Sequence, residues 1–212
     1  MGFRDLFGKR GPIVYSEADM ARYEAFVKKN IGEYEKVFHE LVSPDLHIDV
    51  ILVPPAPGKA FYTLVTMGMG AYKMKVPRQY GRMNRAELAM RLPESWEVFS
   101  TEEKWYWPIR TLKMLARLPY QEKSWLGLYH DADFRKPFAE NTELCSVILD
   151  LFDEEMEIPT LENGDEIAVY NVIPLHRAEM DFKVKNGAEA LLDRFGNRIL
   201  HGPVDIGRVS RV

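Results

Sequence analysis

Residues 63–74 read TLVTMGMGAYKM, and residues 85–93 read RAELAMRLP. The first segment continues a run from Phe61 to Met67 that is rich in strand-forming residues, and two glycines follow that run. Glycine adopts positive φ and allows close approach of the backbone to another surface. We therefore predict a strand over Phe61–Met67 and a tight turn at Gly68 and Gly70.

The second segment alternates between apolar and polar residues from Arg85 to Leu92. Alternation with a period of two is typical of an antiparallel strand with one solvated face. The pattern therefore predicts a half-exposed strand that ends at Pro93. The residues between the two strands are polar and basic.

The chain before this region predicts a helix and a strand. Ser16 is a good N-cap, and apolar residues at intervals of three or four favour a helix from there to about Leu41. The apolar segment Leu46–Val53 predicts a central strand that forms a hairpin with Phe61–Met67, because a proline-rich turn joins them.

The chain after this region predicts a second helix from an N-cap at Thr101 to Leu118, with Pro108 kinking or restarting it and Pro119 closing it. Three strands and two short helices are expected next. Their ranges are 126–134, 144–152 and 166–173 for the strands and 175–184 and 188–195 for the helices, with Gly196 as the C′ residue of the last helix. This order predicts an α+β fold in which helices cover a mostly antiparallel sheet.

A length of 212 residues suits one large domain. We divide it into a flexible N-terminal arm (1–15), the domain (16–196) and a C-terminal tail (197–212) that could pack on the domain. The net charge of −4 argues against nucleic-acid or anionic-membrane partners. No apolar run reaches the ~20 residues of a membrane span. Cys145 lies in an apolar run and is expected to be a buried thiol. These features predict a cytoplasmic protein.

Six sequence blocks, in order, resemble the suppressor-of-fused domain family, in particular its short bacterial members. They are HIDVILV (47–53), TLVTMGM (63–69), ELAMRLPESW (87–96), YWPIRTLKMLARLP (106–119), WLGLYH (125–130) and VIPLHRAEMDFKVKNGAEALL (172–192). The chain departs from the family at two places. Gly70 stands where a small hydroxylated residue is expected, and Tyr129 stands where a glycine is expected before the histidine.

The resemblance implies a single domain like the N-terminal domain of suppressor of fused, and a non-enzymatic role in binding another protein. Among bacterial relatives, the most concrete implication is an immunity-type protein that neutralises a toxin by binding it. We expect a monomer or weak homodimer that binds its partner through a sheet edge and the Met67–Tyr80 segment. The predicted partner contacts are Met67, Gly68, Met69, Tyr72, Tyr80, Trp105, Trp107, His130 and Asp131.

The alternative is a metal-assisted hydrolase that uses His47, His130 and Asp131, and a third possibility is a homo-oligomeric structural protein. The sequence has no phosphate-binding loop, no HExxH, no CxxC and no GxSxG. We therefore predict no catalytic residues, no cofactor and no metal. His176 and Glu179 are expected to form a contact on a helix surface. For most of the aromatic residues, packing in the core is the alternative to contact with a partner. The acidic run 150–157 is either a solvated loop or a surface for a basic partner.

Overall fold

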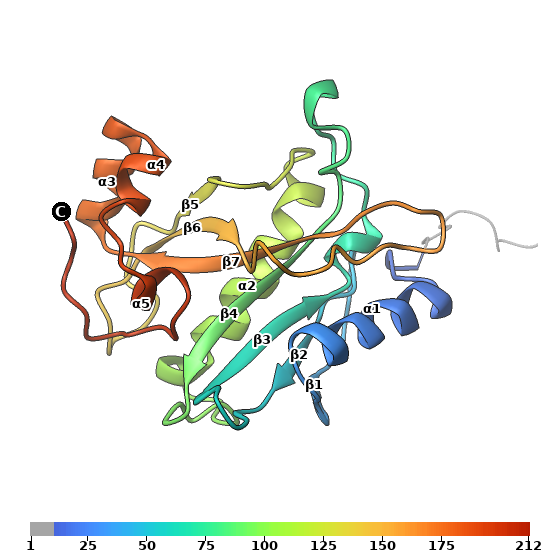
Figure 1. The fold of residues 1–212 in the computed structure, drawn as a ribbon, viewed down its shortest axis with the longest axis horizontal. Coiled ribbons are helices and arrows are strands. Elements are labelled where there is room, and N and C mark those ends of the chain that lie inside the picture. The colour runs from blue at the N-terminus through green and yellow to red at the C-terminus, as the bar shows by residue number, and fades with distance from the viewer. Residues whose placement is uncertain (1–10) are drawn as a thin grey trace, which may run out of the picture.

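The computed structural model describes residues 11–212, which form a seven-stranded sheet with helices on both faces (Figure 1). The strand order is β1-β2-β3-β4-β7-β6-β5. Only β4 and β7 are parallel; the other neighbours are antiparallel. The strands are β1 (Lys36–Phe38), β2 (Asp49–Val53), β3 (Phe61–Met67), β4 (Ala86–Pro93), β5 (Asp131–Asp133), β6 (Ser146–Leu151) and β7 (Ala168–Leu175). The predicted α+β fold is confirmed.

The helices divide between the two faces of the sheet. Leu112 of α2 belongs to a buried cluster with Leu64 and Leu88 on one face. Val27 of α1 belongs to a cluster with Ala89 on the other face, where α3 and α4 cover the β6–β7 end of the sheet. The helices are α1 (Glu17–Asn30), α2 (Glu103–Gln121), α3 (Arg177–Asn186), α4 (Ala188–Leu192) and α5 (Asn197–Leu200), with short 3₁₀ turns η1 (Met69–Ala71) and η2 (Arg78–Tyr80). Among the described residues, none of these helices has the length and apolar character that a membrane crossing requires.

The first helix is shorter than predicted. Ser16 is its N-cap, as expected, and its hydroxyl accepts the Asp19 N–H at 3.1 Å. The helix ends at Asn30 rather than Leu41. Gly32 has φ of 150°, and a Cβ there would lie 2.7 Å from the Val53 side chain. The chain therefore leaves the helix at this glycine and forms the edge strand β1.

The second helix runs through both prolines. Pro108 lacks the N–H that would bond to the Lys104 carbonyl. The Asn141 side-chain amide donates to that carbonyl instead, at 3.2 Å. Of the two alternatives at Pro108, a kink or a restart, the restart is therefore wrong, and the expected stop at Pro119 is also wrong, since α2 ends at Gln121.

Two further predictions near the C-terminus are corrected. Only Asp131–Asp133 of the predicted strand 126–134 pairs with a neighbouring strand. Gly196 is the N-cap of α5, with φ of −87°, and does not close the preceding helix in the left-handed conformation. Beyond α5, the Val204 N–H donates to the Arg91 carbonyl at 2.8 Å. At the other end of the chain, residues 1–10 of the predicted arm lie outside the described residues.

The strand β4 is buried on both faces, which contradicts the predicted half-exposed strand. It lies between β3 and β7, and helices cover both faces of the sheet there. The alternation of apolar and polar residues therefore separates two buried faces, one of which carries Glu87 and Arg91.

Glu87 is fully buried and accepts hydrogen bonds from three separate parts of the chain. The Tyr15 hydroxyl (2.6 Å) and the N–H groups of Gly68 (2.8 Å) and Gly70 (3.0 Å) donate to Oε1. The Thr66 hydroxyl donates to Oε2 at 2.5 Å. A carboxylate at this position therefore fixes the N-terminal segment, the end of β3 and the turn after it.

Both glycines of the turn are required by this geometry. Gly68 has φ of 129°, and a Cβ there would lie 2.0 Å from the His47 carbonyl oxygen. A Cβ at Gly70 would lie 2.1 Å from the Tyr15 hydroxyl oxygen. The departure from the family pattern at position 70 therefore has a physical reason, because Gly70 leaves room for the tyrosine that reaches Glu87.

We predict that Glu87→Gln changes how stability depends on pH. Burial raises the pKa of Glu87, although the hydrogen bonds from Thr66, Tyr15 and the two glycines oppose that rise. The folded state therefore holds the proton more tightly than the unfolded chain. The corresponding stability is present at low pH and is lost as the pH rises through the folded-state pKa. Each unit of pKa shift corresponds to about 1.4 kcal/mol.

Urea unfolding at several pH values measures this effect. The free energy of unfolding of Glu87→Gln, relative to the natural protein, should increase as the pH rises from about 4, the ordinary range of glutamate. The same substitution at the exposed Glu143 serves as the control for the loss of a surface carboxyl. A constant difference for Glu87→Gln would show that Glu87 has an ordinary pKa.

Candidate functional site

The turn after β3 lies beneath the surface. Met67 and Met69 are 4% and 1% exposed, and Gly68 is buried between them. In this structure these three predicted contact residues are not accessible to a partner. Of the three, Gly68 donates its N–H to Glu87 and so helps to fix the turn that leads to the segment carrying η2.

Three aromatic side chains form a cluster beside the start of β5. Tyr80 of η2 is 42% exposed and stacks on Trp125, with ring centroids 5.2 Å apart. His130 also lies against Trp125, with ring centroids 4.2 Å apart. The structure thus brings together Tyr80 and His130, which are 50 positions apart in the sequence, through a tryptophan that we did not predict as a contact. Tyr72 lies instead against Tyr120 at 5.3 Å.

The two tryptophans of α2 point in different directions. Trp107 is fully buried and stacks on Phe138 at 4.7 Å. Trp105 is partly exposed and packs edge-on against Trp96 at 5.2 Å. Trp107 is therefore a core residue, and Trp105 is the member of the pair that reaches the surface.

The strand β5 forms one edge of the sheet and has a free side. It pairs with β6 in the register Asp131–Ile148, Ala132–Val147 and Asp133–Ser146. The flanking bonds from Leu149 N–H to the His130 carbonyl and from Phe134 N–H to the Cys145 carbonyl show which pairs are hydrogen-bonded. Along antiparallel strands, hydrogen-bonded pairs alternate with pairs that are not hydrogen-bonded. Asp131 and Asp133 are in the second kind of pair, so their N–H and C=O groups point away from β6. These groups form an open row.

A groove of about 540 Å³ separates β5 from α2. Ala132 and Phe134 form one wall, and Met114 and Leu118 are among the α2 residues on the other. Met114 is 47% exposed and lines this groove. Lys113 also lies on the α2 wall. Burial lowers the pKa of its ammonium group, although the negative charges of Glu40 and Asp49 act to raise it.

The acidic side chains of β5 are held by α3 on the opposite face. Asp131 pairs with Lys183, and Asp133 accepts two hydrogen bonds from Arg177, at 2.5 and 2.8 Å. The hydrogen bonds from Arg177 hold the pKa of Asp133 well below its usual range. Both charges are therefore compensated, and the groove side of β5 is mainly apolar.

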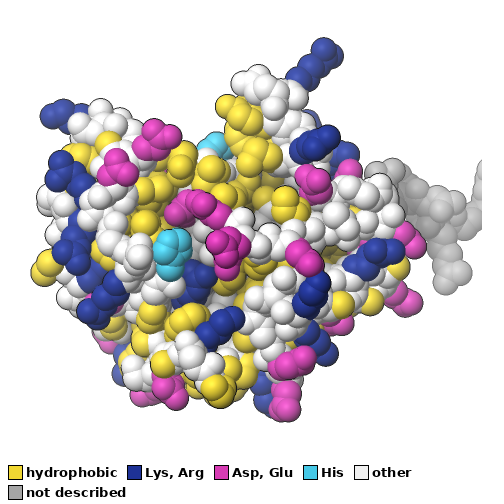
Figure 2. Space-filling model, in the orientation of Figure 1, with side chains coloured by type: hydrophobic (Ala, Val, Ile, Leu, Met, Phe, Trp, Pro, Cys, Tyr) yellow, Lys and Arg dark blue, Asp and Glu magenta, His cyan; other side chains and the backbone are white. Residues whose placement is uncertain are grey.

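The space-filling view shows a hollow between the α3–α4 helix pair and the projection that carries η2 (Figure 2). Hydrophobic side chains form much of its floor, and acidic side chains lie at several points around it. In Figure 1 the segment leading into β5 passes between the same two projections. The surface next to the edge strand is therefore concave and apolar.

The residues of the hydrolase alternative are not assembled. His47 interacts with Ser43 Oγ at 2.7 Å and with Asp49 at 3.0 Å, whereas His130 lies on Trp125 and Asp131 pairs with Lys183. Within residues 11–212, no group of three His, Cys, Asp or Glu side chains is placed to hold a metal ion.

The expected surface contact between His176 and Glu179 is also corrected. His176 is the N-cap of α3, and its backbone N–H donates to Glu179 at 2.8 Å. Glu179 is fully buried and forms a double hydrogen bond with Arg208 of the C-terminal tail, at 2.5 and 2.6 Å. Burial alone would raise the pKa of Glu179, but the hydrogen bonds and charge of Arg208 lower it. The pair therefore attaches the tail to α3.

Tyr129 occupies a position that favours glycine. Its φ is 66°, its N–H donates to the Leu149 carbonyl, and the Leu149 N–H donates to the His130 carbonyl. Two residues thus face one residue of β6, which is a β-bulge with its first residue in the left-handed conformation. The bulge lies immediately before β5, so it sets the direction in which the edge strand starts.

Comparison with protein-family models gives a match to suppressor of fused protein (SUFU) over residues 44–212. A putative SUFU homologue from Neisseria gonorrhoeae is similar in structure, with a TM-score of 0.65 and 19% identity over 93% of this chain and 98% of that one. The chain solved in the Sufu–Fu complex gives a TM-score of 0.64 and 13% identity over 94% and 93% of the two chains.

Drosophila Suppressor of Fused gives a TM-score of 0.56 and 11% identity, and the match covers 92% of this chain and 50% of that one. At these identities the structural likenesses show the fold alone. Comparison with curated proteins gives no match.

We predict that Tyr129→Gly is more stable than Tyr129→Ala by about 1 kcal/mol, because the left-handed conformation costs a residue with a Cβ about that much. Both variants lose the same ring, so their difference reports the backbone alone. At Tyr106, inside α2, the order should reverse, since glycine weakens a helix by about 1 kcal/mol relative to alanine. Urea unfolding measures all four variants. A Tyr129→Ala variant as stable as Tyr129→Gly would contradict the strained bulge.

Proposed function

Because the chain belongs to the suppressor of fused family, we propose that it is a protein-interaction domain that binds an extended segment of another protein along the free edge of β5. The observation that carries this proposal is the open row of N–H and C=O groups at Asp131 and Asp133, which lies beside an apolar groove. An added strand satisfies such groups with backbone hydrogen bonds, and pockets next to the edge select its side chains.

The groove determines which segment fits. A strand beside β5 turns every second side chain toward α2, where Met114, Leu118 and Phe134 offer apolar contact. Lys113 is half-buried on this wall, and its ammonium group donates to the Phe38 carbonyl of β1 at 3.4 Å, so its charge is not left free in the groove. The partner segment is therefore apolar at alternate positions.

The aromatic cluster extends the same surface. Tyr80, Trp125 and His130 lie where the chain enters β5, so a partner that follows the edge reaches them next. Aromatic side chains are frequent binding hot spots because they bury a large area. We assign contact roles to Tyr80, Trp125 and His130, and supporting roles to Met67, Gly68, Met69 and Trp107.

The Sufu–Fu complex is a precedent for protein binding by a relative. For this chain, the finer proposal is an immunity-type protein in the cytoplasm that neutralises a toxin by binding to it. This version depends on the resemblance to short bacterial relatives. Its partner would inhibit growth when expressed alone and would be harmless when expressed with this chain.

The proposal is tested by Ala132→Arg, which places a long charged side chain in the groove and leaves the backbone of β5 unchanged. Tagged natural protein, Ala132→Arg and the control Ala21→Arg, on the exposed side of α1, are used to capture partners from the native lysate. We expect a stoichiometric partner to be retained by the natural protein and the control, and to be reduced at least tenfold with Ala132→Arg.

Two outcomes would contradict the proposal. One is equal retention of the partner by Ala132→Arg, which would place the binding surface elsewhere. The other is loss of the partner with the control as well. Thermal unfolding of each variant confirms that all three proteins are folded before capture.

A further inference from the structure

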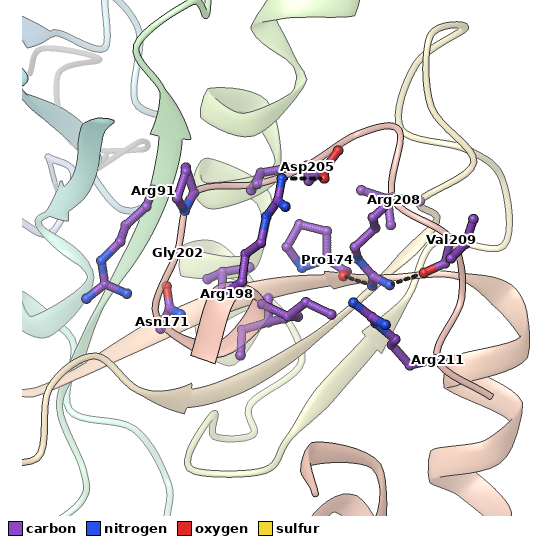
Figure 3. Close-up of a pocket in the computed structure, with 15 residues that line it drawn as sticks. Arg91, Asn171, Pro174, Arg198, Gly202, Asp205, Arg208, Val209 and Arg211 are labelled. Atoms are coloured by element: carbon purple, nitrogen blue, oxygen red, sulfur yellow. Dashed lines mark hydrogen bonds and ion pairs between the residues drawn. The ribbon is translucent and has the colours of Figure 1, made fainter. Parts of the chain in front are cut away.

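A second cavity, of about 230 Å³, lies under the C-terminal tail and away from the β5 groove (Figure 3). Residues of β7, including Asn171, Ile173 and Pro174, form its base. The tail from Arg198 to Arg211 forms its roof. The cavity shares no lining residue with the groove between α2 and β5.

The position of this cavity follows from the one parallel pair in the sheet. β4 and β7 are paired only from Ala86 and Ala168 to Ala89 and Asn171. Their chains then leave toward α2 and α3, which cover opposite faces. Crevices of this kind form beyond the carboxyl ends of parallel strands where the connections diverge, and in α/β folds they are common ligand sites. Here the tail partly fills the crevice, with Val204 bonded to the Arg91 carbonyl.

The lining is strongly cationic. Four arginines and one carboxylate, Asp205, are among the residues that line the cavity. Arg208 is neutralised by its double hydrogen bond with Glu179, and Arg198 pairs with Asp205 at 3.3 Å. Within the described chain, Arg91 and Arg211 form no ion pair with a carboxylate. Two guanidinium groups of the lining thus lack a direct carboxylate partner.

Arg91 keeps one of these charges in a buried place. It is 8% exposed, donates one hydrogen bond to the Phe152 carbonyl at 3.0 Å, and has a buried terminal nitrogen that lacks a partner among the described residues. Burial lowers its pKa to about 10. Its guanidinium points away from the other arginines (Figure 3), so it adds positive potential to the wall of the cavity without reaching its centre.

Arg211 is placed to contact a ligand. Its backbone N–H is held by Glu179 at 3.0 Å, and its side chain is directed toward Arg208 and Pro174 (Figure 3). Arg208 already donates to Glu179, to the Pro174 carbonyl at 2.9 Å and to the Val209 carbonyl at 3.3 Å. The fork of donors on Arg211 is therefore the free one, and a guanidinium fork matches a planar carboxylate with two parallel hydrogen bonds.

We propose that this cavity binds a small monocarboxylate with a short apolar body. The carboxylate pairs with Arg211 at the mouth, where Arg198 lies across the opening, and the apolar body rests on Ile173, Pro174 and Ile199. One free guanidinium fork, on Arg211, and one more distant positive charge, on Arg91, match a ligand that carries a single negative charge. A volume of about 230 Å³ suits a small molecule, and the cavity shares no lining residue with the groove, so the ligand is distinct from the segment bound at β5.

The probes are hexanoate, acetate and hexan-1-ol, titrated into the full chain at constant ionic strength and followed by backbone NMR. We expect saturable shifts at Asn171 and across residues 198–211 with hexanoate. Acetate, which lacks the apolar body, should bind at least tenfold more weakly. Hexan-1-ol, which lacks the charge, should cause no saturable shift there.

The matched variants are Arg211→Ala and, as a control, Arg22→Ala on the exposed side of α1. Arg211→Ala keeps the backbone bond to Glu179, so its fold should be unchanged. We expect its dissociation constant for hexanoate to rise at least tenfold, whereas Arg22→Ala should match the natural protein. The proposal is overturned if hexanoate gives no saturable shift, if Arg211→Ala binds it equally well, or if inorganic phosphate binds more tightly than hexanoate.

Discussion

The carboxylate of Glu87 joins parts of the chain that no local interaction would bring together. Tyr15 precedes the first helix, Thr66 lies near the end of β3, and Gly68 and Gly70 form the turn after it. A buried carboxylate is costly unless donors surround it, and here the hydrogen bonds occupy both of its oxygens. The central strand β4 can therefore carry a carboxyl group on a buried face. The segment that leads to η2 starts from a fixed point as a result.

The function proposed here follows from how completely the sheet is covered. Helices bury both faces, so the backbone groups that remain open are those at the outer edges of β1 and β5. At β5 the acidic side chains are held by Arg177 and Lys183 on one face, and the other face opens into an apolar groove. The bulge at Tyr129 sets the start of this strand, and the aromatic cluster lies beside it. The edge strand is thus flanked by the groove and preceded in the chain by His130 of the cluster.

The sequence predicted the elements with strong periodicity and missed those set by tertiary contacts. The hairpin of β2 and β3, the N-cap at Ser16 and the turn at Gly68 and Gly70 were predictable from local chemistry. The burial of Glu87 was not, because alternation along β4 cannot distinguish a solvated face from one covered by α1. The edge strand β1 was read as helix, since its apolar residues continue the helical spacing beyond Gly32. Trp125 was missed as a site residue because its contacts with Tyr80 and His130 are non-local. The one signal in the sequence that marked this loop was Tyr129, which stands where the family pattern has a glycine before His130.

Amide hydrogen exchange of the domain, alone and with its captured partner, tests the central claim most directly. In the free protein the amides of Asp131 and Asp133 should exchange quickly, while that of Ala132, bonded to β6, should be protected. With the partner bound, the account predicts that the amides of Asp131 and Asp133 become protected at least tenfold and that Ala132 changes little. A partner that binds stoichiometrically and leaves the amides of Asp131 and Asp133 exchanging quickly would contradict strand addition at β5.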